Sequence, residues 1–123
     1  MQVSGINGAG QIVGNVGSTA VMIDHGSTTT LGSFTANAIN NLGQVTGYDA
    51  SSGQAVLYGG GAMTNLGSGE AVLGNVPDRR AIGLALNNMG TVVGEAASEA
   101  GNYVPWTYDH GSMHGMAASP GSE

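Results

Sequence analysis

Apolar and polar residues alternate along this chain in short stretches that glycine and asparagine interrupt, and two such patterns each occur three times. The first pattern is an apolar residue, Asn, two variable residues, Gly, a polar residue and a β-branched stretch that ends in Gly. It covers residues 6–14, 39–47 and 86–94. The second pattern places apolar stretches around a glycine-containing turn. It covers residues 21–31, 56–66 and 106–116. Because the order of the two patterns is the same each time, three equivalent units are predicted.

Each pattern predicts a β-hairpin. In the first, Asn at the start and Gly at the fourth position suit a type I turn, since the Asn side chain caps the turn and Gly accepts a left-handed conformation. In the second, we expect three-residue loops with glycine in the left-handed position, namely at Gly26, Gly61 and Gly111. Two hairpins give about four antiparallel strands per unit. The units are expected to cover approximately residues 3–35, 36–82 and 83–118.

The composition also favours a single all-β domain over residues 1–123. Glycine accounts for 23 residues, so it interrupts every long helical window, and an interior glycine costs a helix about 1 kcal/mol relative to alanine. The best helical candidate, residues 95–100, has glycine on both sides and is expected to be a loop or one turn. A hydrophobic content of 41% argues against disorder. A longer connection over residues 69–83 is expected to be a loop, and the tail from 117 to 123 is expected to fray.

Three four-stranded units that cannot bury their own faces singly predict β-propeller-like blades. Propellers use about 4 to 8 blades, so three blades leave apolar faces uncovered. Two chains that share a six-bladed ring are one solution, and this predicts a homodimer through blade faces. A β-trefoil or β-prism is the alternative that keeps a monomer. A fragment of a longer repeat array is a third possibility.

Charge and residue types exclude several functions. The chain has 2 basic and 8 acidic residues and a formal net charge of -6, so it lacks the basic surface that nucleic acids and anionic membranes require. It has no cysteine, and no apolar run reaches the roughly 18 residues needed to span a membrane. We therefore expect no nucleic-acid binding and no membrane insertion.

Residues 109–114 gather a carboxylate, two imidazoles and a hydroxyl, which suggests catalysis or a metal site. However, His110 and His114 on one strand would stand about 13 Å apart, too far to share one zinc ion. Asp24 and His25 occupy the equivalent turn in the first unit, so these residues are interpreted as turn formers. No hydrolase motif of the G-x-S-x-G form is present. The sequence predicts no enzyme, no catalytic residue, no metal and no cofactor.

Four residues are candidates for ligand binding. Arg79 and Arg80 are able to bind a carboxylate or sulfate in a bidentate manner, although a solvated loop pair is the commoner case. Tyr103 and Trp106 are able to form an aromatic platform for a sugar ring. Trp106 aligns with Val21 and Val56, which instead favours a place in the core or between blades.

The repeat resembles the HAF family of probable extracellular bacterial repeats, whose pattern runs approximately I-N-x-x-G-x-V-V-G and later M-x-x-L-G. Residues 36–67 carry it best, although the His-Ala-Phe that gives the family its name is missing and Pro105 lies in an expected strand. The resemblance implies propeller-like blades, an extracellular or cell-surface setting and no assigned activity. We therefore expect a non-enzymatic, self-associating interaction or scaffold module. A small carbohydrate-binding, lectin-like domain is the alternative. The partners expected for the chain besides a second copy are a glycan or a protein ligand.

Overall fold

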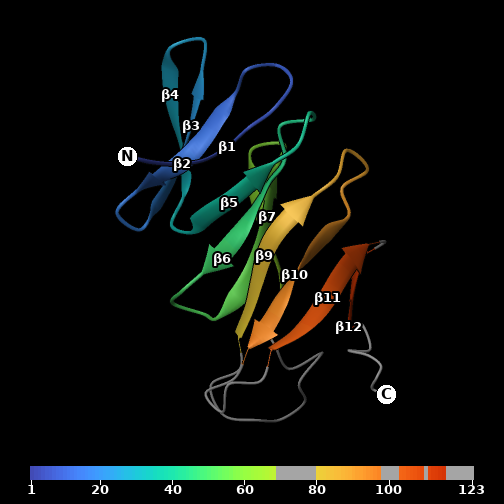
Figure 1. Cartoon of the computed structure of the whole chain (residues 1–123). Helices are drawn as coiled ribbons and strands as arrows, with labels where there is room; N and C mark the ends of the chain where they lie inside the picture. The colour runs from blue at the N-terminus through green and yellow to red at the C-terminus, as the bar shows by residue number, and fades with distance from the viewer. Residues whose placement is uncertain (69–79, 98–102, 110, 116–123) are drawn as a thin grey trace.

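The computed structural model describes residues 1–68, 80–97, 103–109 and 111–115. Over these residues the chain forms twelve strands and no helix, so no helix that could cross a membrane is found among them. Figure 1 shows three sheets that follow one another along the chain, from blue through green to orange. The prediction of an all-β fold with three repeats of four antiparallel strands is confirmed.

Each sheet pairs its four strands in chain order, and we call the sheets the first, second and third blade. The first blade holds β1 (Gln2–Ile6), β2 (Ile12–Val16), β3 (Thr19–Asp24) and β4 (Ser27–Gly32). The second holds β5 (Thr35–Ile39), β6 (Val45–Asp49), β7 (Gln54–Gly59) and β8 (Ala62–Gly67). The third holds β9 (Arg80–Leu86), β10 (Val92–Ala97), β11 (Tyr103–Asp109) and β12 (Ser112–Gly115).

The turn of the second hairpin in each blade ends in a glycine with a left-handed backbone, as predicted. Gly26, Gly61 and Gly111 all have φ of 83°. The predicted loop length is wrong, because Asp24 pairs with Ser27 and the connection therefore has two residues rather than three. Both residues of that connection are left-handed, with φ of 51° at His25, which matches the mirror-image turns whose twist suits a hairpin.

The blades stack face to face, and the hydrophobic core lies between them. Strands β1 and β2 pack on β5, while β6 and β7 pack on β9. Val45 of β6 faces the first blade, whereas the side chain of its neighbour Thr46 lies against Gly83 of the third blade. The first and third blades therefore lie on opposite faces of the second.

Two separate cores result. The buried members of the first are Val13, Ala20, Phe34, Ala36, Val45 and Val56. The buried members of the second are Ala55, Leu66, Ala81, Val92, Ala96 and Trp106. A β-prism has one core shared by three sheets, and a β-trefoil has a closed barrel. The described strands form neither, so the arrangement is that of stacked blades.

Two predicted loops are partly strand. Residues 80–83 belong to β9 and residues 95–97 to β10, because Ala96 pairs with Ala81 and Ala97 with Arg80. Ala81 and Ala96 are both fully buried in the second core, so their burial stabilises a longer hairpin than the glycine pattern indicates. The rest of these two segments, and the tail beyond residue 115, lie outside the described residues.

Candidate functional site

The turn between the first two strands of each blade is built around an asparagine side chain. Asn7 Oδ1 accepts hydrogen bonds from the backbone N–H of Ala9, at 3.1 Å, and of Gln11, at 2.9 Å. Gly10 is left-handed, and its N–H donates to the Asn7 carbonyl oxygen. Asn40 and Asn87 make the same set of bonds in the other two blades. The predicted capped turn is thus present three times.

These asparagines also join the blades to one another. Asn7 Nδ2 donates to the Asn40 carbonyl oxygen at 3.0 Å, and Asn40 Nδ2 donates to the Asn87 carbonyl oxygen at 2.8 Å. We call Asn7, Asn40 and Asn87 the asparagine ladder. Their place in the repeat predicted only a local turn role, although the same residue in all three copies was a signal for a shared contact.

A second set of bonds accompanies the ladder. The Gly8 N–H donates to Asn41 Oδ1 at 2.6 Å, and the Asn41 N–H donates to Asn88 Oδ1 at 2.8 Å. Each of these bonds again runs from one blade to the next blade along the chain. The blades are therefore fixed in register by polar contacts at one edge of the stack as well as by the cores.

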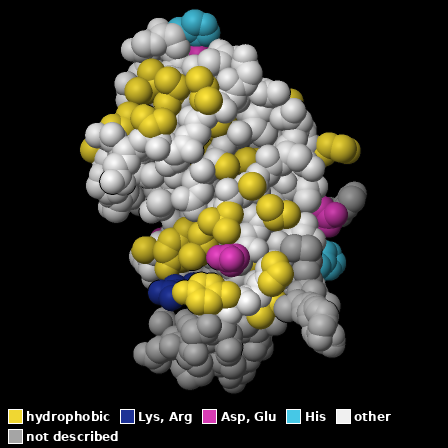
Figure 2. Space-filling view, in the orientation of Figure 1, with side chains coloured by type: hydrophobic (Ala, Val, Ile, Leu, Met, Phe, Trp, Pro, Cys, Tyr) yellow, Lys and Arg dark blue, Asp and Glu magenta, His cyan; other side chains and the backbone are white. Residues whose placement is uncertain are grey.

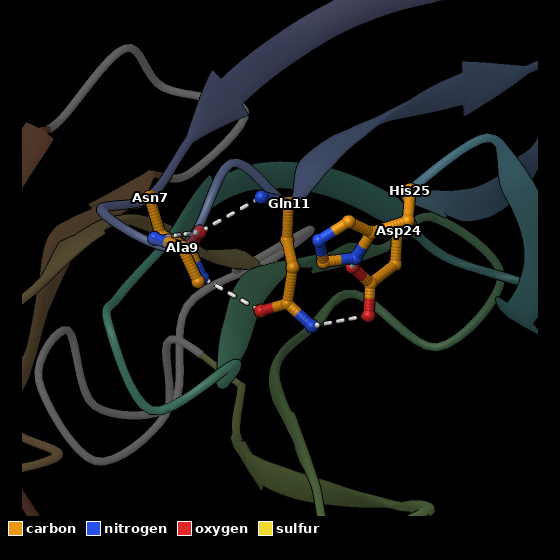
Figure 3. A network of polar contacts seen from close by, with 5 residues as sticks. All are labelled: Asn7, Ala9, Gln11, Asp24 and His25. Atoms are coloured by element: carbon orange, nitrogen blue, oxygen red, sulfur yellow. Dashed lines mark hydrogen bonds and ion pairs between the residues drawn. The ribbon is translucent and has the colours of Figure 1, made fainter.

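A polar network extends the ladder at the first blade (Figure 3). Asn7 Nδ2 donates to Gln11 Oε1 at 2.7 Å, Gln11 Nε2 donates to Asp24 Oδ2 at 3.2 Å, and His25 Nδ1 lies 2.6 Å from Asp24 Oδ1. The Asp24 and His25 side chains are 43% and 86% exposed. The network links two turns of one blade at the surface, in keeping with the interpretation of Asp24 and His25 as turn formers.

Beside the corresponding turn of the third blade, His114 Nε2 on β12 lies 3.8 Å from Asp109 Oδ1 at the end of β11, and His110 of the turn itself lies outside the described residues. Among the residues that the structure describes, no three His, Cys, Asp or Glu side chains gather in a way that suits a metal ion. The described geometry at Asp109 includes a contact with His114 at the surface.

A second polar link between blades uses bulges in the first strand of a blade. Asn15 on β2 accepts from the Ala36 N–H at 2.8 Å and donates to the Ala36 carbonyl at 3.1 Å. Asn37 donates to the Gly83 carbonyl at 2.7 Å. Ala36 and Gly83 precede equivalent register shifts in β5 and β9, which leave backbone groups free for these amides.

The predicted ligand-binding residues occupy different places. Trp106 is fully buried in the second core, in agreement with the core interpretation and not with a sugar platform open to solvent. Tyr103 is 64% exposed, and Arg80 is half-buried with a buried Nε that has no hydrogen-bond partner among the described residues. Arg80 and Tyr103 both pair with Ala97 and so share a face of the third blade. Arg79 lies outside the described residues.

Each end blade leaves one apolar face open in the described structure. On the first blade, Val3 and Ile6 are 68% and 65% exposed, and Figure 2 shows hydrophobic side chains gathered at the top of the view, over this blade. On the third blade, Leu84 and Val93 are 45% and 38% exposed. Val93 holds the position in its repeat that the fully buried Val13 holds in the first.

Two surface hollows lie elsewhere. One is lined by Leu42, Gln44, Leu57, Gly59, Gly60 and Thr64, none of which is titratable. The other includes Asp49, whose carboxylate accepts from the Ser51 hydroxyl and N–H. The hydrogen bond from the Ser51 hydroxyl is the main cause that lowers the pKa of Asp49. Neither hollow brings together an acid, a base and a nucleophile.

No family model, no curated protein and no solved structure matches the chain. The features that bear on function are therefore the asparagine ladder along one edge of the stack and the open apolar face at each end. Both concern contacts between blades. An interaction surface is accordingly the best-supported candidate site.

Proposed function

We propose that the chain is a non-enzymatic interaction or scaffold module of propeller-like repeats that associates with itself through the open faces of its end blades. One observation carries this proposal. Positions that are 0% exposed between blades, such as Val13 and Ala36, are matched on the end faces by Val93 and Val3, which are 38% and 68% exposed. Apolar side chains that are exposed on a sheet face whose equivalents are buried between blades are typical of an interaction surface.

The resemblance to the HAF repeat family supports the same proposal. The pattern I-N-x-x-G-x-V-V-G covers the turn that carries the asparagine ladder and the strand that follows it. In this proposal two chains complete a six-bladed ring, and an extracellular or cell-surface setting is part of it.

The test is the mass of the chain in solution, measured by light scattering at rising micromolar concentration. We expect twice the monomer mass of 12.1 kDa. The variant Ile6→Asp, which puts a charge on the open face of the first blade, is expected to stay monomeric. Leu42→Asp is the matched control, because Leu42 is 69% exposed in a turn of the second blade. A folded wild-type chain that remains at 12.1 kDa at every concentration contradicts the proposal.

A carbohydrate ligand is a second candidate, favoured by the position of Arg80 and Tyr103 on one face of the third blade. An exposed tyrosine ring stacks on a sugar and an arginine binds its acidic groups. A glycan array tests this candidate, with binding lost in Tyr103→Ala while the circular dichroism spectrum is unchanged. Absence of binding to every glycan by the wild-type chain contradicts it.

A further inference from the structure

We propose that the association is head-to-tail, with the asparagine ladder continuing from one chain into the next. The open face of the third blade packs on the open face of the first blade of a second copy, and Asn87 Nδ2 donates to the Asn7 carbonyl oxygen of that copy. This inference rests on the proposed function and specifies its partner, its two surfaces and its register.

The two ends of the ladder are complementary in hydrogen bonding. Asn7 and Asn40 each use Nδ2 for two bonds, one to a glutamine in the same turn and one to the next blade. Asn87 Nδ2 makes neither bond within the described residues, because Thr91 stands where the other turns have Gln and because none of these residues forms a blade against the outer face of the third. Accordingly, Asn40 is 4% exposed whereas Asn87 is exposed.

At the other end of the ladder, the carbonyl oxygen of Asn7 has room for one more hydrogen bond. The carbonyl oxygen of Asn40 accepts from the Gly43 N–H and from Asn7, and that of Asn87 accepts from the Gly90 N–H and from Asn40. The carbonyl oxygen of Asn7 accepts only from the Gly10 N–H within the described residues. A carbonyl oxygen has two lone pairs, so the donor that is free at one end fits the acceptor site that is free at the other.

The open apolar faces of the third and first blades are complementary in the same way as the faces that already pack inside the chain. Val13 of the first blade packs in the first core with Val45 of the second. Val93 holds the position of Val13 in the third repeat, and Ile12 holds the position of Val45 in the first repeat. A third blade placed on the first blade of a second copy therefore brings Val93 against Ile12, in the type of contact that the chain already makes. Such a heterologous contact gives a ring when its rotation closes.

Two positions at this junction depart from the junction between the first and second blades, and the position of Asn15 is held by Tyr48 in the second blade. Gly8 has no side chain to accept from the Asn88 N–H of another copy, as Asn41 Oδ1 accepts from Gly8. Glu95 holds the position of Asn15, whose amide both donates to and accepts from the next blade. A carboxylate only accepts and adds a charge to an apolar face. Gly8→Asn and Glu95→Asn are therefore expected to strengthen association, each by about tenfold in Kd.

The direction of packing is tested by mixing two blocked variants. Ile6→Asp blocks the first-blade face and Val93→Asp blocks the third-blade face, and both residues are exposed, so circular dichroism is expected to show an intact fold. Each variant alone is expected to be monomeric. A 1:1 mixture is expected to give a heterodimer by sedimentation, at a higher concentration than wild type needs, because only one of two junctions remains.

The outcomes separate the two proposals. If the wild-type chain dimerises but Val93→Asp or Ile6→Asp also dimerises alone, or if the mixture stays monomeric, the head-to-tail arrangement is overturned while self-association stands. If the wild-type chain is monomeric at every concentration, the proposed function itself fails.

The register is tested at Asn87. Asn87→Ala is expected to weaken dimerisation about tenfold, since it removes the donor that crosses the junction. Asn88→Ala is the matched control, because its N–H remains and Gly8 offers no side chain to it, so its effect on dimerisation is expected to stay below about twofold. An unchanged Kd in Asn87→Ala overturns the continuation of the ladder.

Discussion

Asn40 and Asn87 are the same residue in the same turn of two neighbouring blades, yet Asn40 is 4% exposed and Asn87 is exposed. Both cap their turns with the same two backbone hydrogen bonds. Among the described residues, the amide of Asn40 donates to the next blade, and that of Asn87 has no such acceptor. The difference teaches that the local structure of a repeat is set within the repeat, whereas its burial and polar satisfaction are set by the next blade.

The largest effect is expected at Trp106. Trp106 and Tyr103 lie in the same strand, but Trp106 faces the second core at 0% exposure whereas Tyr103 is 64% exposed. Trp106→Ala is expected to lower the free energy of unfolding by about 3–5 kcal/mol, and Tyr103→Ala by less than about 0.5 kcal/mol. Urea unfolding followed by circular dichroism measures both. Equal losses in the two variants would show that the inner and open faces do not differ.

The asparagine ladder gives the next effect. Asn40→Ala removes two capping bonds and two amide bonds at a buried site, and it is expected to cost about 3 kcal/mol. Asn87→Ala removes the capping bonds alone, as far as the described residues extend, and is expected to cost about 1 kcal/mol. Thermal unfolding of the monomer at low concentration compares them. A similar loss in both variants would mean that the contact with the next blade contributes nothing.

Val13 and Val93 hold equivalent positions, so they allow an inner face and an open face to be compared with the same type of side chain. Val13 is fully buried between blades and Val93 is 38% exposed. Val13→Ala is expected to cost about 2 kcal/mol and Val93→Ala less than about 1 kcal/mol in the monomer. At a concentration where the chain dimerises, the loss of unfolding free energy in Val93→Ala is expected to grow toward that in Val13→Ala. If the loss in Val93→Ala does not depend on protein concentration, a second copy does not cover that face.

The smallest effect is expected at Asp49, whose carboxylate is bound within its own turn. The Ser51 hydroxyl lowers the pKa of Asp49 below the ordinary value of 3.8. A lowered pKa in the folded chain stabilises the fold above the ordinary value, and this stabilisation is lost as the pH falls through the lowered pKa. Ser51→Ala is expected to reduce the difference in Tm between about pH 6 and about pH 2.5. A larger difference in the variant would contradict this assignment.

The sequence was sufficient for the features that depend on neighbouring residues. Asn7 and Gly10 specify the capped turn, and Gly26 specifies the hairpin, because φ preferences and side-chain capping act within four residues. The three blades followed from the recurrence of these turns. The left-handed His25, and with it the two-residue turn, was not predicted. A three-residue loop with the same glycine is equally compatible with the sequence.

The features that were not predicted depend on contacts between blades. The strand residues at 80–83 and 95–97 are set by the burial of Ala81 and Ala96 in the second core, which glycine spacing does not show. The cross-blade bonds of Asn40 need the register between two sheets, which is a non-local property. The burial of Trp106 was inferred only by alignment with Val21 and Val56, since its own neighbours in the sequence do not reveal which face it occupies.

Amide hydrogen exchange at a series of concentrations tests most directly whether the end faces are covered by like units. Amides of β1 and of the turn at Asn87 are expected to exchange more slowly as the protein concentration rises, while those of β6, which lies between two blades, do not change. Exchange rates of β1 and of the Asn87 turn that are identical at all concentrations would contradict this expectation.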